Sequence, residues 1–454
     1  MYSVEMILKN ERGEVINHDV AAIYQLDLAR GTAEEIESEL SRLKATLLPG
    51  LMNDLLKAEQ QRYVPQVSAE WRRNGTTPVT LKSLHGKIHF CLQRFAHKTE
   101  KERHSDYFEL TQQFPEDYLT PGLKELVAYY SNRQSYEEVE KLVERISGER
   151  LVSDQKAWKV VVDKALEISQ QQAMTVAKFI QEHPVYVPLV ETQFSIYQPQ
   201  EEETLIFNDA ILVKEQKETR PRTPLPMPEA KEGTSWISHD VVLLQTPQGF
   251  EYVTAGMDAE GQPAVALADV VQQRWQAHYG QDREPRKLVA ITDGAKCIRN
   301  LLCTIFGVTV VLILDWYHLS KKVVNLMSMI ARNKAEKVEH IRQMLLYLWH
   351  GFTSEAVAYL REQVIPRHLE KWQELIHYLE KHQTEIIDYG ERKRAGKTIG
   401  SGRMEKAVDQ VVGHRQKKKG ISWVPKGSKA LAILKTVELN QQWQPLWFPD
   451  RAAA

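Results

Sequence analysis

The first hundred residues change from a helical to an alternating pattern of apolar positions. In residues 32–61, apolar side chains recur at helical spacing, which predicts one long helix. Residues 78–98 alternate between apolar and polar side chains, as a pair of strands does. We therefore expect residues 1–120 to form an N-terminal α+β region, to which the pattern assigns no role.

Residues 121–190 show only the helical pattern, broken by short turns. Ser135 and Glu138 fit the Ser-x-x-Glu capping box at the start of one of these helices. Helix, short turn and helix at this spacing outline a helix-turn-helix motif. If the motif binds DNA, its third helix enters the major groove with Lys156 and Lys159 near its start. A plain helical bundle has the same pattern, so both interpretations stand.

Residues 200–318 alternate strands of the buried type with amphipathic helices. The pattern predicts strands at 204–216, 239–245, 251–258, 287–292 and 309–314, and helices at 264–280 and 298–307. Three strands thus meander before two helix–strand units add parallel strands, which is the order of the ribonuclease H-like fold.

Two further regions complete this domain. Residues 319–395 are helical and are expected to form an insertion, after which residues 396–448 return to the same domain. The predicted fold class is therefore α/β: a ribonuclease H-like mixed-sheet core with an all-α insertion, preceded by a mostly α-helical N-terminal region.

Length and composition indicate a cytoplasmic protein of two or three domains. The chain has 454 residues, and no apolar stretch approaches the ~20 residues that span a bilayer, so no membrane partner is expected. The N-terminus lacks the layout of a signal peptide. The three cysteines, Cys91, Cys297 and Cys303, form no Cys-x-x-Cys pair, which argues against a disulfide framework and a cysteine zinc site.

Positive charge is concentrated near the C-terminus. Residues 391–429 hold twelve lysines and arginines but three acids, a net +9 in a chain whose overall charge is −1. Such segregation favours a surface that faces a polyanion, although a solvated lysine-rich face would have the same composition. The candidate DNA-binding residues here are Arg403, Arg415, Lys417, Lys418, Lys419 and Trp423; the tryptophan could stack on a base or belong to the core.

Two aspartates stand where strands of the predicted sheet would bring them together. Asp209 lies inside the first strand, where an unpaired buried carboxylate is costly and a metal ion would relieve the cost. Asp293 follows the fourth strand, which should be the neighbour of the first. Both side chains offer the hard oxygen ligands that Mg²⁺ prefers.

A third acid, Glu405, completes a candidate metal site. It lies early in a helix that Ser401 could cap, among basic residues that would grip phosphates. Two Mg²⁺ or Mn²⁺ ions held by Asp209, Asp293 and Glu405 could activate a water or a 3′-hydroxyl and stabilise the leaving oxygen. Each acid also has an ordinary interpretation: a half-exposed edge strand, a turn, or a helix surface.

The stretch VLILDWYHLSKK raises the question of why a buried strand ends in Asp-x-x-His. Asp315 ends a strand at the same sheet edge as Asp293, but its strand lies one position further from that of Asp209. Imidazole suits zinc and softer metals better than magnesium. We therefore expect Asp315 and His318 to form a supporting network at the rim of the site.

Three stretches, in this order, resemble one family: ITDGAKCIRNLL, LILDWYHLSKK and IGSGRMEKAVDQVVGHRQKKKGISWVPKGSKALAILK. They are similar to the ISKra-type (Kra-four) family of bacterial insertion-sequence transposases, DDE enzymes with a ribonuclease H-like core. The resemblance covers roughly residues 200–448. It implies a catalytic triad of Asp209, Asp293 and Glu405. Many members carry paired cysteines in the N-terminal half, whereas Cys91 stands alone here.

The resemblance implies a DNA transposase that binds the terminal inverted repeats of an element, cleaves them and joins the freed ends to target DNA. It further implies a homodimer or larger assembly in synapsis, and a nucleoid-associated location. Two alternatives stay open: a nuclease or resolvase on the same fold that does not join ends, and a non-catalytic DNA-binding protein derived from a transposase.

Overall fold

The computed structural model describes residues 2–4, 7–15, 24–26, 31–67, 70–100, 102–113, 117–191, 193–217, 235–282, 284–307 and 310–449. The proline-rich stretch 220–233, expected to be a loop, lies outside these residues. None of the helices among the described residues combines the length and hydrophobicity that crossing a bilayer requires.

The chain is a mixed α/β protein that divides into two compact units, Met1–Val161 with Gln444–Ala454, and Val162–Trp443. A division near residue 190 was predicted, but the boundary falls inside the long helix α5 (Asp154–Glu182).

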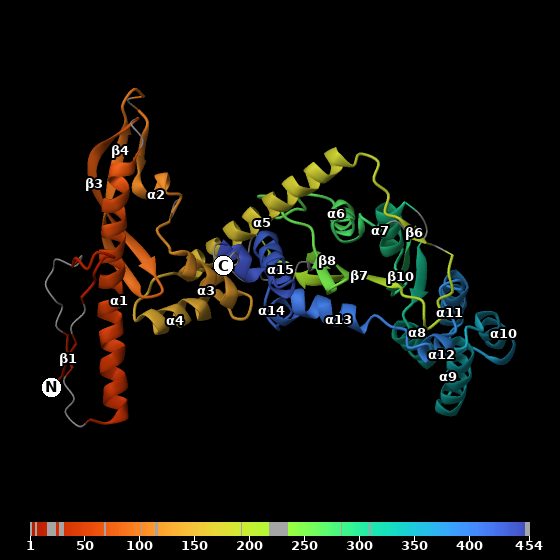
Figure 1. Ribbon diagram of the computed structural model, residues 1–454. Helices are drawn as coiled ribbons and strands as arrows, with labels where there is room; N and C mark the ends of the chain where they lie inside the picture. The colour runs from red at the N-terminus through yellow and green to blue at the C-terminus, as the bar shows by residue number, and fades with distance from the viewer. Residues whose placement is uncertain are drawn as a thin grey trace, which may run out of the picture. The chain divides into compact units, whose positions relative to one another are not determined.

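The first unit contains the predicted helix and strand pair. Helix α1 (Ala33–Tyr63) begins at Thr32, whose side chain accepts a hydrogen bond from the N–H of Glu35. Strands β3 (Trp71–Ser83) and β4 (Gly86–His97) form a hairpin against which the C-terminal part of α1 packs (Figure 1). The smaller elements are β1 (Tyr2–Val4), β2 (Tyr24–Leu26), η1 (Val64–Gln66), β5 (His104–Asp106) and α2 (Tyr107–Leu110).

Three helices follow, in the region where the sequence predicts only helices. They are α3 (Pro121–Ser131), α4 (Tyr136–Ser147) and the start of α5. The capping box of Ser135 and Glu138 is present, and Gly148 ends α4. Their facing side chains form one small core that includes Leu123, Val143 and Val160. The helix-turn-helix outline therefore exists, while its contact with DNA stays a prediction.

The second unit is built on a mixed sheet with the strand order β11-β10-β7-β8-β9. Strands β7 (Thr204–Lys214), β8 (Trp236–Thr246) and β9 (Gly249–Val253) are antiparallel, and β10 (Arg286–Thr292) and β11 (Val311–Leu314) are parallel to β7. The short β6 (Val190–Glu191) pairs with β10. All five strands predicted in residues 200–318 are confirmed, and the predicted meander followed by parallel strands is confirmed with them.

Helices cover both faces of this sheet. Helices α6 (Leu267–Tyr279) and α7 (Lys296–Phe306) pack on the face that carries Ile206, Val242 and Leu288. On the other side, α13 (Gly402–Val408) contacts β7 and β8, and α15 (Pro425–Leu439) contacts β8 and β9 (Figure 1). Between them lie the π-helical turn η2 (Asp409–Gly413) and α14 (His414–Gln416). The last helix is α16 (Trp443–Trp447).

The predicted helical insertion stands between β11 and α13. Its helices are α8 (Trp316–Ile330), α9 (Lys334–Trp349), α10 (Thr353–Gln363), α11 (Leu369–Lys381) and α12 (Tyr389–Arg394). Two contacts fasten its far end to the sheet: the N–H of Leu314 donates to the carbonyl of Glu385 at 2.9 Å, and Tyr389 donates to the carbonyl of Leu314 at 2.8 Å. The insertion therefore packs against the same strand end from which it leaves.

Candidate active site

Three neighbouring strands bring three aspartates into line at one sheet edge. The register of β10 with β7, continued past the paired residues, sets Asp293 opposite Asp209, because each lies three residues beyond the last matched pair. On the other side of β10, the last matched pair is Thr292 with Leu314. Asp293 and Asp315 are the residues that follow. The prediction that the first and fourth strands of the domain are neighbours is confirmed.

Asp209 is half-buried on β7, a central strand, so the alternative of an edge strand is wrong. Its Oδ1 atom accepts a hydrogen bond from the backbone N–H of Ala210 at 2.7 Å. Burial raises the pKa of its carboxyl group, and the charges of Asp293 and Glu405 raise it further. The three predicted ligands are thus close enough for their charges to act on one another.

Asp293 is exposed, and the turn that carries it is rigidly held. Its Oδ1 atom accepts a hydrogen bond from the N–H of Ala295 at 2.8 Å. Gly294 between them has a φ of +86°, and a Cβ there would lie 2.5 Å from Cε1 of His382. His382 is buried, and its Nδ1 atom lies 2.8 Å from Oε2 of Glu385. The surroundings therefore fix the backbone and leave the carboxylate of Asp293 open to solvent.

Glu405 reaches the site from the facing helix. It lies in the first turn of α13, and its side chain is 63% exposed. Its Oε1 atom is 3.8 Å from Nε2 of His318, which is longer than a hydrogen bond, so the contact is electrostatic. Ser401 is the N-cap residue of α13, as expected, but its hydroxyl makes no capping hydrogen bond.

Asp315 at the end of β11 has a structural role, because both of its carboxylate oxygens accept backbone hydrogen bonds. Oδ1 accepts from the N–H of His318 at 2.8 Å and so caps α8. Oδ2 accepts from the N–H of Ser401, which begins the helix of Glu405. The carboxyl group is buried, which raises its pKa, but the hydrogen bonds of His318 and Ser401 outweigh burial and lower the pKa to about 2.

His318 stands between Asp315 and Glu405. Its Nδ1 atom lies 3.5 Å from Oδ1 of Asp315, opposite the side that faces Glu405. Asp315 raises the pKa of the imidazole more than burial lowers it, and Glu405 and Asp293 add to the rise. His318 thus lies between Asp315 and Glu405, and its neighbouring carboxylates favour its protonated form, while the predicted supporting network stays a prediction.

A pocket of about 390 Å³ opens beside the aspartates. It is lined by Asn208, Asp209, Ala210, Asp240, Leu267, Asp293, Ala295, Cys297, Ile298 and Leu301. Asp240 was missed by the sequence analysis. It lies on β8 opposite Ala210. The sequence contains a signal for it, since it is the one acid inside the apolar second strand.

The donor set fits a hard cation, although the side chains are not arranged around one. The three acids supply only carboxylate oxygens, which is the chemistry of magnesium and manganese sites. Within the described ranges, no three His, Cys, Asp or Glu side chains are grouped as metal ligands would be.

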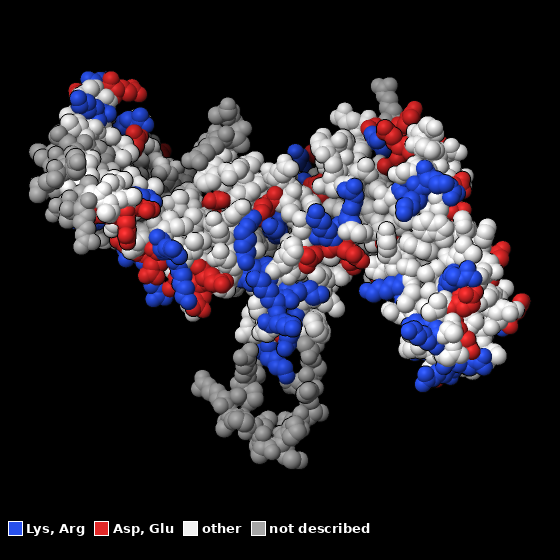
Figure 2. All heavy atoms as spheres, turned by 90° about the horizontal axis from the view of Figure 1, so that it is seen from below, with Lys and Arg blue, Asp and Glu red and all other residues white. Residues whose placement is uncertain are grey.

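In the basic segment 391–429, some of the candidate DNA-binding residues are exposed to solvent and others are buried. On the face seen in Figure 2, lysine and arginine side chains gather in a band. Arg403 and the run Lys417–Lys419 are exposed. Arg415 and Trp423 are each 7% exposed, and the guanidinium of Arg415 lies 4.7 Å from the centre of the Trp423 ring. This burial does not favour the predicted contact of Arg415 with phosphate, and Trp423 belongs to the core.

The two lysines of the helix-turn-helix outline also differ. Lys156 pairs with Asp117 at 2.9 Å, where a second lysine, Lys124, pairs at 2.8 Å. Both lysines lower the pKa of Asp117 against the effect of burial. Lys159 is exposed. Lys156 therefore stabilises the fold, and Lys159 is the one of the two that is open to a partner.

Comparison with known proteins gives this chain no family. No protein-family model matches it, and no curated protein matches it either. The function must therefore be argued from the site.

Proposed function

We propose that the chain is a DDE-type DNA transposase with a ribonuclease H-like catalytic core. The observation that carries the proposal is the convergence of Asp209, Asp293 and Glu405. Two come from adjacent strands and the third from the facing helix, across 196 residues of sequence from first to last (405 minus 209). No requirement of packing brings three like charges together, so a functional reason is the better explanation.

The topology supports the same proposal. In the order in which the five core strands follow one another along the chain, they lie as 3-2-1-4-5 in the sheet, with the last two parallel to the first. This is the arrangement expected of a ribonuclease H-like fold. The helical segment between β11 and α13 stands where the resemblance expects an insertion.

Asp209, Asp293 and Glu405 would hold Mg²⁺ or Mn²⁺. Such ions, two in the expected mechanism, supply Lewis acidity that activates an oxygen nucleophile and stabilises the leaving oxygen at phosphorus. The protein's own part is to keep Asp209 and Asp293 in register through the sheet. Asp315 fixes the start of the helix of Glu405, and His318 offsets the charge of the carboxylates.

The exposed basic residues would hold the DNA backbone. Arg403 is on the helix of Glu405, and Lys417–Lys419 follow twelve residues after that acid. Lysine and arginine contacts to phosphates give binding that weakens steeply as salt increases. We therefore assign Arg403 and Lys417–Lys419 to the phosphates that flank the scissile bond. Joining two element ends requires both in one complex, so the proposal includes at least a dimer.

The decisive experiment measures cleavage of DNA that carries the genomic sequence on both sides of the coding region, in Mg²⁺ or Mn²⁺. Asp293→Asn and Glu405→Gln should reduce cleavage to background while DNA binding in EDTA is kept. The matched control is Glu355→Gln on α10, an exposed glutamate away from the site, which should cleave like wild type. If both site variants cleave normally, the triad is wrong.

A second assay separates transposition from simple hydrolysis. Pre-cleaved ends with free 3′-hydroxyls are incubated with a target plasmid, and joined products are counted. A transposase joins them, whereas a nuclease or resolvase on the same fold does not.

A non-catalytic DNA-binding protein remains the second candidate, favoured by the lack of a ready-made ligand group among the described residues. Calorimetric titration with Mn²⁺ tests it. Heat that is lost in Asp209→Asn supports the enzyme, and no binding by the wild type supports the alternative.

A further inference from the structure

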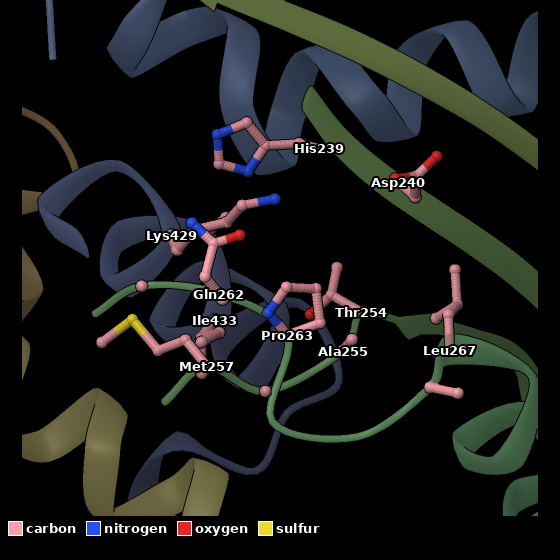
Figure 3. A pocket seen from close by; sticks show the side chains of 14 residues that line it. His239, Asp240, Thr254, Ala255, Met257, Gln262, Pro263, Leu267, Lys429 and Ile433 are labelled. Carbon is pink, nitrogen blue, oxygen red and sulfur yellow. The ribbon is translucent and has the colours of Figure 1, made fainter. Parts of the chain in front are cut away.

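A second, smaller pocket of about 200 Å³ lies beside the candidate active site. It is formed by β8, by the segment 254–267 that follows β9, and by α15 (Figure 3). Asp240 and Leu267 line both pockets, so the two are neighbours. We therefore expect a DNA strand bound at the aspartates to lie close to the second pocket.

The walls of the pocket are mostly apolar, with a few polar groups among them. The apolar part consists of Ala255, Met257, Pro263, Ala266, Leu267, Ala432 and Ile433. The polar side chains are Asp240, Thr254, Gln262, Lys429 and His239. Apolar walls with a small number of placed polar groups are typical of a small-molecule site, in which the polar groups fix the orientation of the ligand.

Lys429 is the group in this pocket that most needs a partner. Burial lowers the pKa of its ammonium group, and the charge of Asp240 offsets only part of that effect. It donates to the carbonyl of Ser238, which uses one of its three N–H bonds. Figure 3 shows its ammonium end extending toward the strand that carries Asp240. A ligand acceptor between these two groups would relieve the cost of burying the charge.

The residues around Lys429 are fixed before any ligand arrives. Ser428 lies 2.7 Å from Nε2 of His239, and the side-chain amide N–H of Gln416 donates to the carbonyl of Ser428 at 3.0 Å. Burial lowers the pKa of His239 to about 3, so this ring is neutral and brings no second positive charge to the pocket. The pocket is therefore preorganised, with one cation, Lys429, facing one anion, Asp240.

We infer that this pocket takes an unpaired guanine base of the strand that is bound at the candidate active site, an inference that rests on the proposed function. Guanine offers the acceptor O6 beside two donors, N1–H and the exocyclic N2 amine. Lys429 can donate to O6 while the carboxylate of Asp240 accepts from both donors, and the apolar walls cover the ring. A base that is taken out of the helical stack can be recognised in a pocket by hydrogen bonds to its Watson–Crick edge.

The test measures the preference for guanine in single-stranded DNA by fluorescence anisotropy, in EDTA and at one salt concentration. The probes are a thymine oligonucleotide and the same oligonucleotide with one central guanine, one central hypoxanthine or one central adenine. The guanine probe should bind about tenfold more tightly than the thymine probe, as one well-placed pair of base contacts provides. Hypoxanthine lacks the exocyclic amine and should lose most of this preference.

Two variants locate the preference in the pocket. Lys429→Met and Asp240→Asn should each bring the guanine and thymine probes to within twofold of each other. Lys426→Met removes a lysine from the same helix that does not line the pocket, so it should keep the preference. Equal binding of all four probes by the wild type overturns the inference, as does a preference that survives in both pocket variants.

Because the assay needs neither metal nor cleavage, its outcome is independent of the cleavage assay. Cleavage without a guanine preference would contradict the proposed base pocket but not the proposed transposase activity. A guanine preference without metal-dependent cleavage would contradict the proposed transposase activity and would support a DNA-binding protein that recognises guanine.

Discussion

The ends of β10 and β11 begin from the same sequence pattern and reach opposite outcomes. Each is a buried apolar run that stops at an aspartate, and the two aspartates follow paired residues of adjacent strands. Asp315 is buried, and both of its oxygens accept backbone hydrogen bonds. Asp293 is exposed, and among the described residues it accepts a hydrogen bond from its own turn, through Oδ1. One acid is committed to the fold, and the other is available for chemistry.

This difference shows what an acid needs to serve as a ligand. Other groups must fix the backbone at the acid, so that the carboxylate oxygens remain available to bind a metal ion. At β10, Gly294, His382 and Glu385 hold the turn, so Asp293 is not needed for it. At β11, Asp315 itself fixes the backbone, because its oxygens accept the hydrogen bonds of His318 and Ser401. Substitutions at the two strand ends should therefore affect different properties.

The largest effect is expected at Asp315. Asp315→Ala leaves two buried backbone N–H groups without acceptors and should lower the free energy of unfolding by roughly 3 kcal/mol. Urea unfolding followed by tryptophan fluorescence measures it. Asp293→Ala, the matched substitution on the neighbouring strand, should change the same quantity by less than about 0.5 kcal/mol. Equal losses at both positions would contradict the comparison.

The pH dependence of stability should separate the two acids next. The pKa of Asp315 is about 2 in the folded chain, below the ordinary aspartate value of 3.8. Because the folded value is the lower one, the ionised carboxylate stabilises the fold above pH 4, and this stabilisation is lost as the pH falls from 4 towards 2. Wild type should therefore lose up to about 2 kcal/mol more than Asp315→Asn between pH 5 and pH 2. Parallel stability curves for the two proteins would show that the shift is absent.

Gly294→Ala tests whether the turn at β10 is held from outside. Its positive φ and the close approach of His382 should cost about 1–2 kcal/mol of stability, measured as a fall in the urea midpoint. Gly402→Ala is the control, because a Cβ there meets nothing within 4 Å and φ is not positive. An unchanged midpoint for Gly294→Ala would mean that the turn adapts, and the rigid platform for Asp293 would be lost as an explanation.

The smallest effect is expected at Asp209, and it has the opposite sign. Burial and two nearby carboxylates raise its pKa, so its ionised form at pH 7 destabilises the fold slightly. Asp209→Asn should raise the free energy of unfolding by a few tenths to about 1 kcal/mol without divalent ions. Adding Mn²⁺ should raise the melting temperature of wild type but not of this variant. A variant less stable than wild type would give Asp209 a structural role instead.

Much of the scaffold follows from local patterns in the sequence. The capping box of Ser135 and Glu138 and the five core strands depend on neighbours in the chain, which the sequence displays directly. The pairing of β7 with β10 also follows, since few topologies connect a meander to parallel strands.

Contacts between distant segments could not be predicted in the same way. A run of charges does not tell which of its members folds back, so Arg415 was expected to face DNA although it lies on the ring of Trp423. Asp240 was missed because its importance depends on two pockets that exist only in the folded chain. The partners of Asp315 are a third case, since Ser401 is 86 residues away.

The hydrogen bond from the N–H of Ser401 to Asp315 links the two ends of the helical insertion. It joins the point where the chain leaves the sheet to the point where it returns, and the N–H of Trp316 donates to the carbonyl of Ile399 at 3.2 Å beside it. The segment between these two ends supplies His382 and Glu385, which hold the turn of Asp293, whereas α9 and α10 supply no residue that holds the three acids. A circular permutant with its new termini within α9 or α10, and its original termini joined, should still bring the same acids together.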